Sequence, residues 1–184
     1  DTAKSFSDVV SGSGAIRKEG PGTLTLSSVQ TYAGVTYIDA GVLQVAATNV
    51  LPRGAGKGVV EIKSGATLDA NNLNLMVGGL SGAGLVTNSA GGLRNLYVGE
   101  NSVTSIYSGV LDAALALVKI GGGKQTLSNT NGAVSQASVQ AGVLELAGPV
   151  TVAGSVSVAD GAALIVSDAV SGLAGEFFDL TVAP

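Results

Sequence analysis

Carboxylates are the side chains of this sequence best able to do acid–base chemistry, because it contains no histidine and no cysteine. That composition excludes a Ser-His-Asp triad, a cysteine nucleophile and an ordinary zinc site. Asp39, Glu61 and Asp69 could share one face of a repetitive β structure, and two neighbouring carboxylates can hydrolyse a glycosidic bond. The thirteen acidic residues are spread singly, however, so we expect these three to be solvated surface groups.

Two further patterns could bind a ligand. The segment 121–126, GGGKQT, resembles a phosphate-binding loop, but Val118 stands where the first glycine is required and Gln125 replaces the serine or threonine. We therefore expect a turn there. The four tyrosines are the rings that could stack on sugars, and Tyr32 is expected to pack against the next coil instead: Tyr32, Tyr37, Tyr97 and Tyr107. We predict no catalytic residue, no cofactor and no metal site.

Composition bounds the class of protein. The 46% apolar content rules out a disordered chain, while 28 glycines among 184 residues disfavour helices and suit frequent turns. The net charge of −4 gives no attraction to nucleic acid. No apolar run approaches the length that a membrane-spanning helix needs. The sequence starts at Asp1 rather than Met, which is expected of a mature product or an excised fragment.

Short alternating segments predict β-strands that bury one side. The centres of this alternation fall about 19 residues apart, which is the length of one coil of a parallel β-solenoid: Leu24, Leu43, Ile62 and Leu80. Stacked coils would then place Thr25, Gln44 and Lys63 on one outer face. Glycine and asparagine before the strands suit the corners, since both tolerate positive φ. Residues 112–120 are expected to be strand rather than helix.

The sequence also contains a long internal repeat. Residues 6–46 align without a gap with residues 107–147, and 14 of the 41 pairs are identical, including Lys18 with Lys119. The loop 51–57 is about five residues longer in the first copy. We expect one β-helix domain over residues 1–184, with long repeats at about 1–96 and 97–170. Residues 171–184, with Phe177 and Phe178, are either a cap or the start of another domain.

The first copy resembles the passenger-associated transport repeat of autotransporter proteins. The residues that match its pattern lie between Gly20 and Val45 and include the stretch GTLTLS and the Ala40-Gly41 pair. The lead-in at residues 6–20 is similar as well. The second copy lacks the tyrosine element, because Ala133, Val134 and Ser135 stand where Tyr32, Ala33 and Gly34 do. A corner of different construction is expected there.

The resemblance implies an all-β fold, a right-handed parallel β-helix with coils of about 18–20 residues. It also implies a structural passenger segment that is secreted or held at the outer membrane of a Gram-negative bacterium. Such a segment would assist translocation and folding and act as a stalk or adhesin scaffold. The partners implied are a translocator barrel during export, adjacent coils, and a host-surface protein or glycan. The alternatives are a carbohydrate-active β-helix enzyme, a tailspike or a glycan-binding adhesin module.

Overall fold

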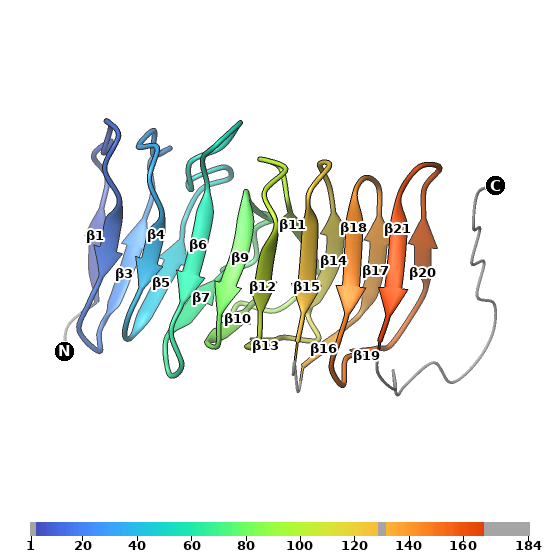
Figure 1. The fold of residues 1–184 in the computed structure, drawn as a ribbon. Helices are drawn as coiled ribbons and strands as arrows, with labels where there is room; N and C mark the ends of the chain where they lie inside the picture. Colours follow the sequence, from blue (N-terminus) through green and yellow to red (C-terminus); the bar gives the residue numbers. More distant parts are fainter. Residues whose placement is uncertain (1–2, 129–131, 168–184) are drawn as a thin grey trace.

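The computed structural model describes residues 3–128 and 132–167, and their regular structure consists of β-strands. The strands pair in parallel, coil upon coil, from β1 at one end to β21 at the other (Figure 1). The longest sheet has eight strands, so the chain forms a parallel β-solenoid of about eight coils. This confirms the predicted fold class. In the described residues no helix is long and apolar enough to cross a membrane. Phe177 and Phe178 lie outside the described residues.

Three sides enclose the core. Sheet A contains β1 (Lys4–Phe6), β3 (Thr23–Leu26), β5 (Val42–Val45), β7 (Thr67–Asp69), β10 (Leu85–Thr87) and β13 (Val110–Leu111). Sheet B contains β2 (Ile16–Lys18), β4 (Thr36–Ile38), β6 (Val59–Ile62), β9 (Gly79–Gly82), β12 (Ser105–Tyr107), β15 (Lys124–Leu127), β18 (Val143–Leu146) and β21 (Ala163–Val166).

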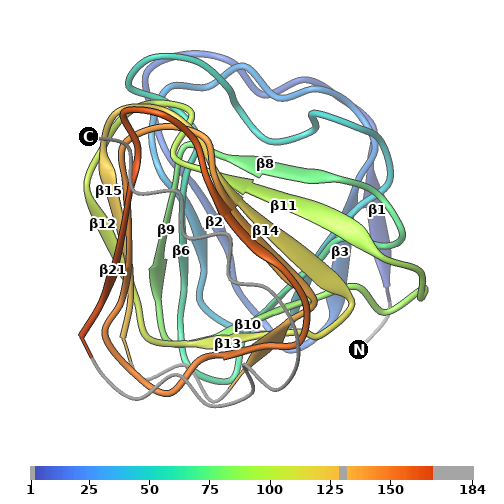
Figure 2. The ribbon, with the colours of Figure 1, turned by 90° about the vertical axis from the view of Figure 1, so that its right-hand side faces the viewer.

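Sheet C contains β8 (Leu75–Val77), β11 (Arg94–Val98), β14 (Leu115–Lys119), β17 (Gln136–Val139) and β20 (Val156–Val158). A two-stranded sheet D, β16 (Ala133–Val134) and β19 (Thr151–Val152), continues the side of sheet A in the last coils. The view along the axis shows these sides around a common interior (Figure 2). The chain visits them in the order B, A, C.

The interior is filled by rows of aliphatic side chains. On sheet A, Leu24 stacks on Leu43 as predicted, but the next residue of that row is Leu68. Ile62 stacks instead on Ile38 in sheet B, and Leu80 pairs with Val60 there. The predicted single row of Leu24, Leu43, Ile62 and Leu80 is therefore wrong, although all but the half-buried Leu24 are fully buried.

Unequal loops explain the error. Thr23 pairs with Val42, and Val42 pairs in turn with Thr67, so the second step along the chain is longer than the first. The extra residues lie in the loop between β5 and β6, which contains the long segment 51–57. Residues at a constant spacing in the sequence therefore stop stacking on one another here and lie on different sheets beyond this loop.

The row of outward-facing side chains on sheet A also differs from the predicted one. Thr25 and Gln44 are neighbours as predicted, and the Thr25 hydroxyl lies 3.2 Å from the Gln44 amide oxygen. The next residue of the row is Asp69, not Lys63. Lys63 follows β6 on the other side and lies beside Asp39.

The corners use the residues that the sequence indicated. Gly20, Gly41, Gly65 and Gly161 have positive φ values, as do Asn71 and Asn72. Segment 112–120 contains β14 and no helix, as expected. Segment 121–126 is a glycine corner followed by β15, which confirms the turn.

The two copies of the long repeat lie on different sides of the solenoid. The first copy places β2 and β4 on sheet B and β3 and β5 on sheet A. The second places β14 and β17 on sheet C and β15 and β18 on sheet B. The second copy is therefore displaced by four coils and two further sides. Each repeat specifies strands on two adjacent sides of successive coils and the corners between them, and the surrounding chain decides which sides they occupy.

Candidate functional site

The three carboxylates singled out from the sequence do not come together. Asp39 and Glu61 lie along sheet B, whereas Asp69 lies in β7 on sheet A. Asp39 is paired with Arg17, and Lys63 Nζ lies 3.0 Å from its Oδ1 atom. The hydrogen bond from Arg17 and that from Lys63 lower the pKa of Asp39. Asp39 is therefore held as a carboxylate by two cations and has no acidic partner.

Asp69 is a buried structural acceptor and not a solvated group. It is 3% exposed and accepts hydrogen bonds from Gln44 Nε2 at 2.8 Å and from Ser89 Oγ at 2.6 Å. The backbone N–H groups of Asn71 and Ser89 also donate to it, each at 3.0 Å. Burial opposes its ionisation, but these hydrogen bonds prevail and its pKa lies below the usual value. The group fastens one coil to the next.

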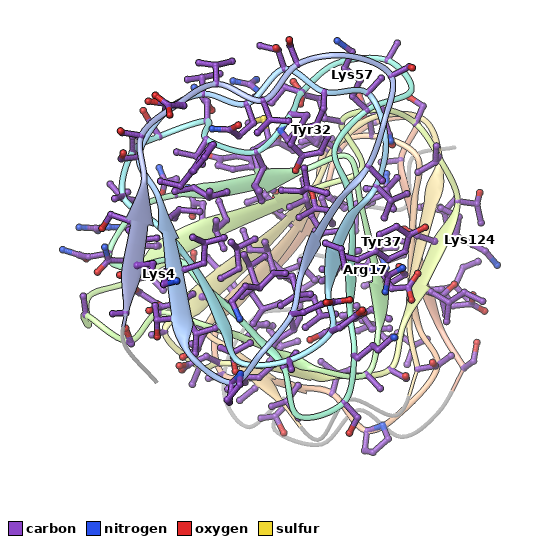
Figure 3. The ribbon with its side chains drawn as sticks, turned by 90° about the vertical axis from the view of Figure 1, so that its left-hand side faces the viewer. Lys4, Arg17, Tyr32, Tyr37, Lys57 and Lys124 are labelled. Carbon is purple, nitrogen blue, oxygen red and sulfur yellow. The ribbon has the colours of Figure 1, made fainter. Side chains whose placement is uncertain are left out.

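The tyrosines divide into two buried and two accessible rings. Tyr32 is 1% exposed and its hydroxyl is hydrogen-bonded to Thr36 four residues further on, so the ring is buried, while its packing against the next coil stays a prediction. Tyr107 is fully buried and donates to Gly84 O at 2.8 Å. The guanidinium of Arg17 lies 4.5 Å from the centre of the Tyr37 ring, and the two side chains lie together on the outer surface (Figure 3). Tyr97 is half-buried. Only Tyr37 and Tyr97 could touch a sugar.

The feature shared by both repeats is a buried lysine at a corner. Lys18 points inward in the row of Ile38 and Ile62, and its ammonium group donates to three carbonyl oxygens. These belong to Glu19 at 2.9 Å, Gly20 at 2.6 Å and Ala40 at 2.9 Å. The first two lie in its own corner and the third lies one coil further on. The lysine therefore joins two coils through backbone atoms alone.

Lys119 makes the same arrangement in the second repeat. It stands in a row of valines, between Val98 and Val139, and it is fully buried. Its ammonium group donates to the carbonyl oxygens of Ile120 and Gly121, each at 2.7 Å, and of Ala141 at 3.1 Å. Burial lowers the pKa of both corner lysines. The three carbonyl oxygens replace water around each cation, which is what its burial requires.

The following glycine of the motif permits this contact. Gly41 has φ 68°, and a Cβ atom built on it would lie 2.5 Å from Gly22 O and 2.6 Å from Gly20 O. Gly142 repeats this against the carbonyl oxygens of Gly121 and Gly123, both at 2.5 Å. A side chain at either position would separate the coils. The Ala-Gly pair of the repeat therefore brings the alanine carbonyl within reach of the lysine.

Neither Lys18 nor Lys119 was assigned a role from the sequence, although the two are identical in the aligned repeats. The alternation of inward and outward residues along each strand already indicated that both lysines face the interior. Ile16 and Lys18 have the same parity, as have Leu117 and Lys119, so each lysine belongs to the inward set.

A second buried polar side chain, that of Gln125, was not predicted from the sequence either. Gln125 is 1% exposed, and its Nε2 atom donates to Leu80 O at 3.0 Å, two coils away. Its Oε1 atom accepts from Leu80 N at 3.2 Å and from Ser105 Oγ at 2.6 Å. Strands β9 and β12 pair only through Tyr107 and Gly82, and the Gln125 amide occupies the gap. The residue that departs from the phosphate-loop pattern thus has a structural use.

The long loop of the first copy is fastened across two coils. Arg53 NH2 lies 2.8 Å from Glu100 Oε1, and its Nε atom lies 3.2 Å from both Glu100 oxygens. Asn101 Nδ2 donates to Lys57 O at 2.8 Å. Gly78 lies between them, where a Cβ atom would be 2.0 Å from Lys57 O. This loop stands at the outer end of the coil (Figure 3, Lys57).

The described residues thus use their polar groups mainly to hold coils together. Within residues 3–128 and 132–167 no three acidic, histidine or cysteine side chains are grouped so as to hold a metal ion. Asp112 accepts a hydrogen bond from the Thr87 hydroxyl, and Glu145 accepts one from the Lys124 ammonium group. The second copy builds its third side differently, as expected: β16 begins at Ala133, whereas the first copy has an irregular segment around Tyr32.

Comparison with known proteins agrees with this geometry. The model of the passenger-associated transport repeat matches residues 16–45 and 117–146, which are the two stretches that contain the lysine corners. The chain is 33% identical over 147 residues to the Adhesin BmaC autotransporter of Brucella suis biovar 1 (strain 1330). The alignment covers 78% of this chain and 4% of that protein. No solved structure matches the chain. The chain is a β-solenoid segment of an autotransporter passenger that carries two passenger-associated transport repeats.

Proposed function

We propose that the segment is a non-catalytic scaffold of a secreted or surface-displayed protein, and that its repeats help the passenger to fold as it is exported. The observation that carries this proposal is the pair of lysine corners, since each couples one coil to the next through backbone carbonyls. In a solenoid each coil is stabilised chiefly by its neighbours, so folding can propagate coil by coil. Folding outside the cell would then favour outward movement of the chain.

The proposed setting is the surface of a Gram-negative bacterium. The translocator barrel is the partner during export, and residues 1–184 act as one β-helix unit. The relative named above is called an adhesin. A host-surface protein or glycan is accordingly the proposed partner of the whole protein, with this segment as stalk or scaffold.

The first test is whether residues 1–184 fold alone. The purified chain should give a β-type far-ultraviolet circular dichroism spectrum and a cooperative unfolding transition. An unfolded chain in buffer would contradict a self-supporting scaffold.

The export role needs a test in the full-length protein. Gly142→Val should reduce the protein reaching the surface several-fold, because the valine side chain separates two coils. Antibody labelling of intact cells measures that amount. Val9→Ser is the matched control, since Val9 is 57% exposed, and it should leave display unchanged. Normal display of a Gly142→Val protein whose isolated segment is unfolded would refute the export role.

Binding of a glycan by this segment is the second candidate, and the outer Arg17–Tyr37 pair favours it. A glycan array should then show a signal that Tyr37→Ala removes and Tyr32→Phe retains, since Tyr32 is buried. A screen for cleavage of pectins and bacterial glycans tests the non-catalytic assignment. Turnover that depends on Asp39 or Glu61 would overturn it.

A further inference from the structure

Neighbouring strands of sheet B pair closely except at one place, near the middle of the rod, where β12 follows β9 (Figure 1). The other neighbouring strands of this sheet share three or four residue pairs each. Strands β9 and β12 share one, Tyr107 with Gly82. Side chains of the later coil stand in the gap, since a Cβ atom on Gly79 would lie 2.9 Å from Val103 Cγ2 and 3.0 Å from Ser105 Oγ. Ladder pairing between these two described strands is therefore lost along most of β9.

Polar side chains that reach past a whole coil surround this gap. Arg53 binds Glu100 across 47 positions of the chain, and Asn101 Nδ2 binds the backbone of the long loop across 44. Gln125 binds both backbone groups of Leu80 across 45 positions. The other side-chain hydrogen bonds of the described residues span at most 26 positions, which is the step to an adjacent coil. These three contacts, which we call the clasps, thus gather where the strand pairing fails.

The clasps hold the gap from both sides. The two loop contacts come from the coil before β9, and one passes over Gly78, where a Cβ atom would lie 2.6 Å from Asn101 Nδ2. The Gln125 amide comes from the coil after β12, and its Nε2 atom lies 3.4 Å from Ser105 O. A buried amide can supply hydrogen bonds that a strand would otherwise supply, but it does so through one side chain rather than a continuous ladder. Few, separate interactions therefore close this face of the solenoid.

We infer that the solenoid has a joint here: the coils of β9 and β12 part along sheet B more readily than the neighbouring coils do, and the clasps keep them closed. Sheets A and C cross the joint through two and three residue pairs, so the coils stay attached on those sides when sheet B opens. The repeats at 16–45 and 117–146 lie on opposite sides of the joint. The rod therefore consists of two units, each with one repeat, that can bend relative to one another.

A matched pair of backbone amides tests the joint. The Ser108 N–H binds Gly82 O across it, and the Ser128 N–H binds Tyr107 O at the same place one coil later, both at 2.8 Å. Amide hydrogen exchange of the 184-residue chain, followed by NMR, should give Ser108 a protection factor at least about ten-fold below that of Ser128, because a joint opens without global unfolding. Equal protection of the two amides would overturn the joint.

Removing a clasp should open the joint further. Gln125→Leu keeps a side chain of similar size in the interior and should speed exchange at Ser108 about ten-fold again, although the hydrogen bond of Ser108 itself does not involve the glutamine. The Lys63 N–H, which binds Ile38 O within the first unit, should be unaffected. Gln136→Leu is the matched control, since Gln136 is exposed and its replacement should leave both amides unchanged.

The surface clasps give an independent variant, because changes there do not disturb the interior. Arg53→Ala combined with Asn101→Ala should speed exchange at Ser108 several-fold and leave Lys63 unchanged. Unchanged or slower exchange at Ser108 in both variants would overturn the clasps. Equal acceleration at Ser108 and Lys63 in either variant would show that the coils open as one unit, and would overturn the joint.

Discussion

Lys18 and Lys119 donate to the same three kinds of carbonyl oxygen, yet the first lies between sheets B and A and the second between sheets C and B. The third sides of their coils also differ, since Tyr32 is buried in one and β16 replaces that element in the other. The corner is therefore independent of the side it occupies and of the tyrosine element. What the motif fixes is a backbone crossing between coils.

The largest expected effect is the difference in stability loss between alanine substitutions at the corner glycines Gly121 and Gly20. Gly121→Ala should lower the free energy of unfolding by about 3–5 kcal/mol, because the new methyl group meets Gly99 O. Gly20→Ala has a similar positive φ but open space around it, so it should cost only about 1–2 kcal/mol. Urea denaturation followed by circular dichroism measures both. Equal losses would mean that the preceding coil contributes nothing.

Replacing the lysines comes next in size. Lys119→Met should cost about 3 kcal/mol, since it leaves three buried carbonyl oxygens without a donor. Lys18→Met should cost about 1 kcal/mol, because water reaches the more open corner and can replace the ammonium group. The same denaturation experiment applies. A larger loss at Lys18 than at Lys119 would reverse our ranking of the corners.

Acid should act on Asp69, the third residue of the polar row on sheet A, because the equivalent row of the second repeat begins with Thr126 and Glu145 but has no third polar residue. Ile165 occupies the position equivalent to Asp69 there. The folded pKa of Asp69 is lowered, so its contribution is present above the unfolded pKa of about 3.9 and is lost as pH falls through the folded pKa. Asp69→Asn should cost about 1–2 kcal/mol at neutral pH.

The pH profile supplies the check on that assignment. Stability curves of the wild type and Asp69→Asn should converge at low pH, where both side chains are neutral. The exposed Asp8→Asn variant is the control and should follow the wild type throughout. Parallel curves for Asp69→Asn would show that its effect is not due to charge.

The smallest effect concerns the long loop, which only the first copy has. Arg53→Ala should change the free energy of unfolding by no more than about 0.5 kcal/mol, because the Arg53–Glu100 pair lies at the surface and is partly exposed, at 37% and 22%. It should nevertheless speed cleavage of residues 51–57 by a protease of broad specificity. Unchanged cleavage would mean that the Asn101–Lys57 contact alone holds the loop.

Alternation and glycine spacing were sufficient to predict the solenoid, because strands such as β5 and β18 bury every second residue. The register beyond the second coil was not predictable, since the loop before β6 breaks the constant spacing. The ion pair of Asp39 with Lys63 depended on that same register and was missed. No role was predicted for Lys18, although its parity with Ile16 in the strand already places it on the inward side.

The displacement of the second repeat by two sides has a consequence for a passenger assembled by duplication. Copies of one motif need not line up along a single edge of the rod. Corresponding residues of the two copies, such as Arg17 on sheet B and its counterpart Val118 on sheet C, then lie on different sides of the rod. A rod of this kind can diversify what it presents in every direction while the crossings that hold it together stay unchanged.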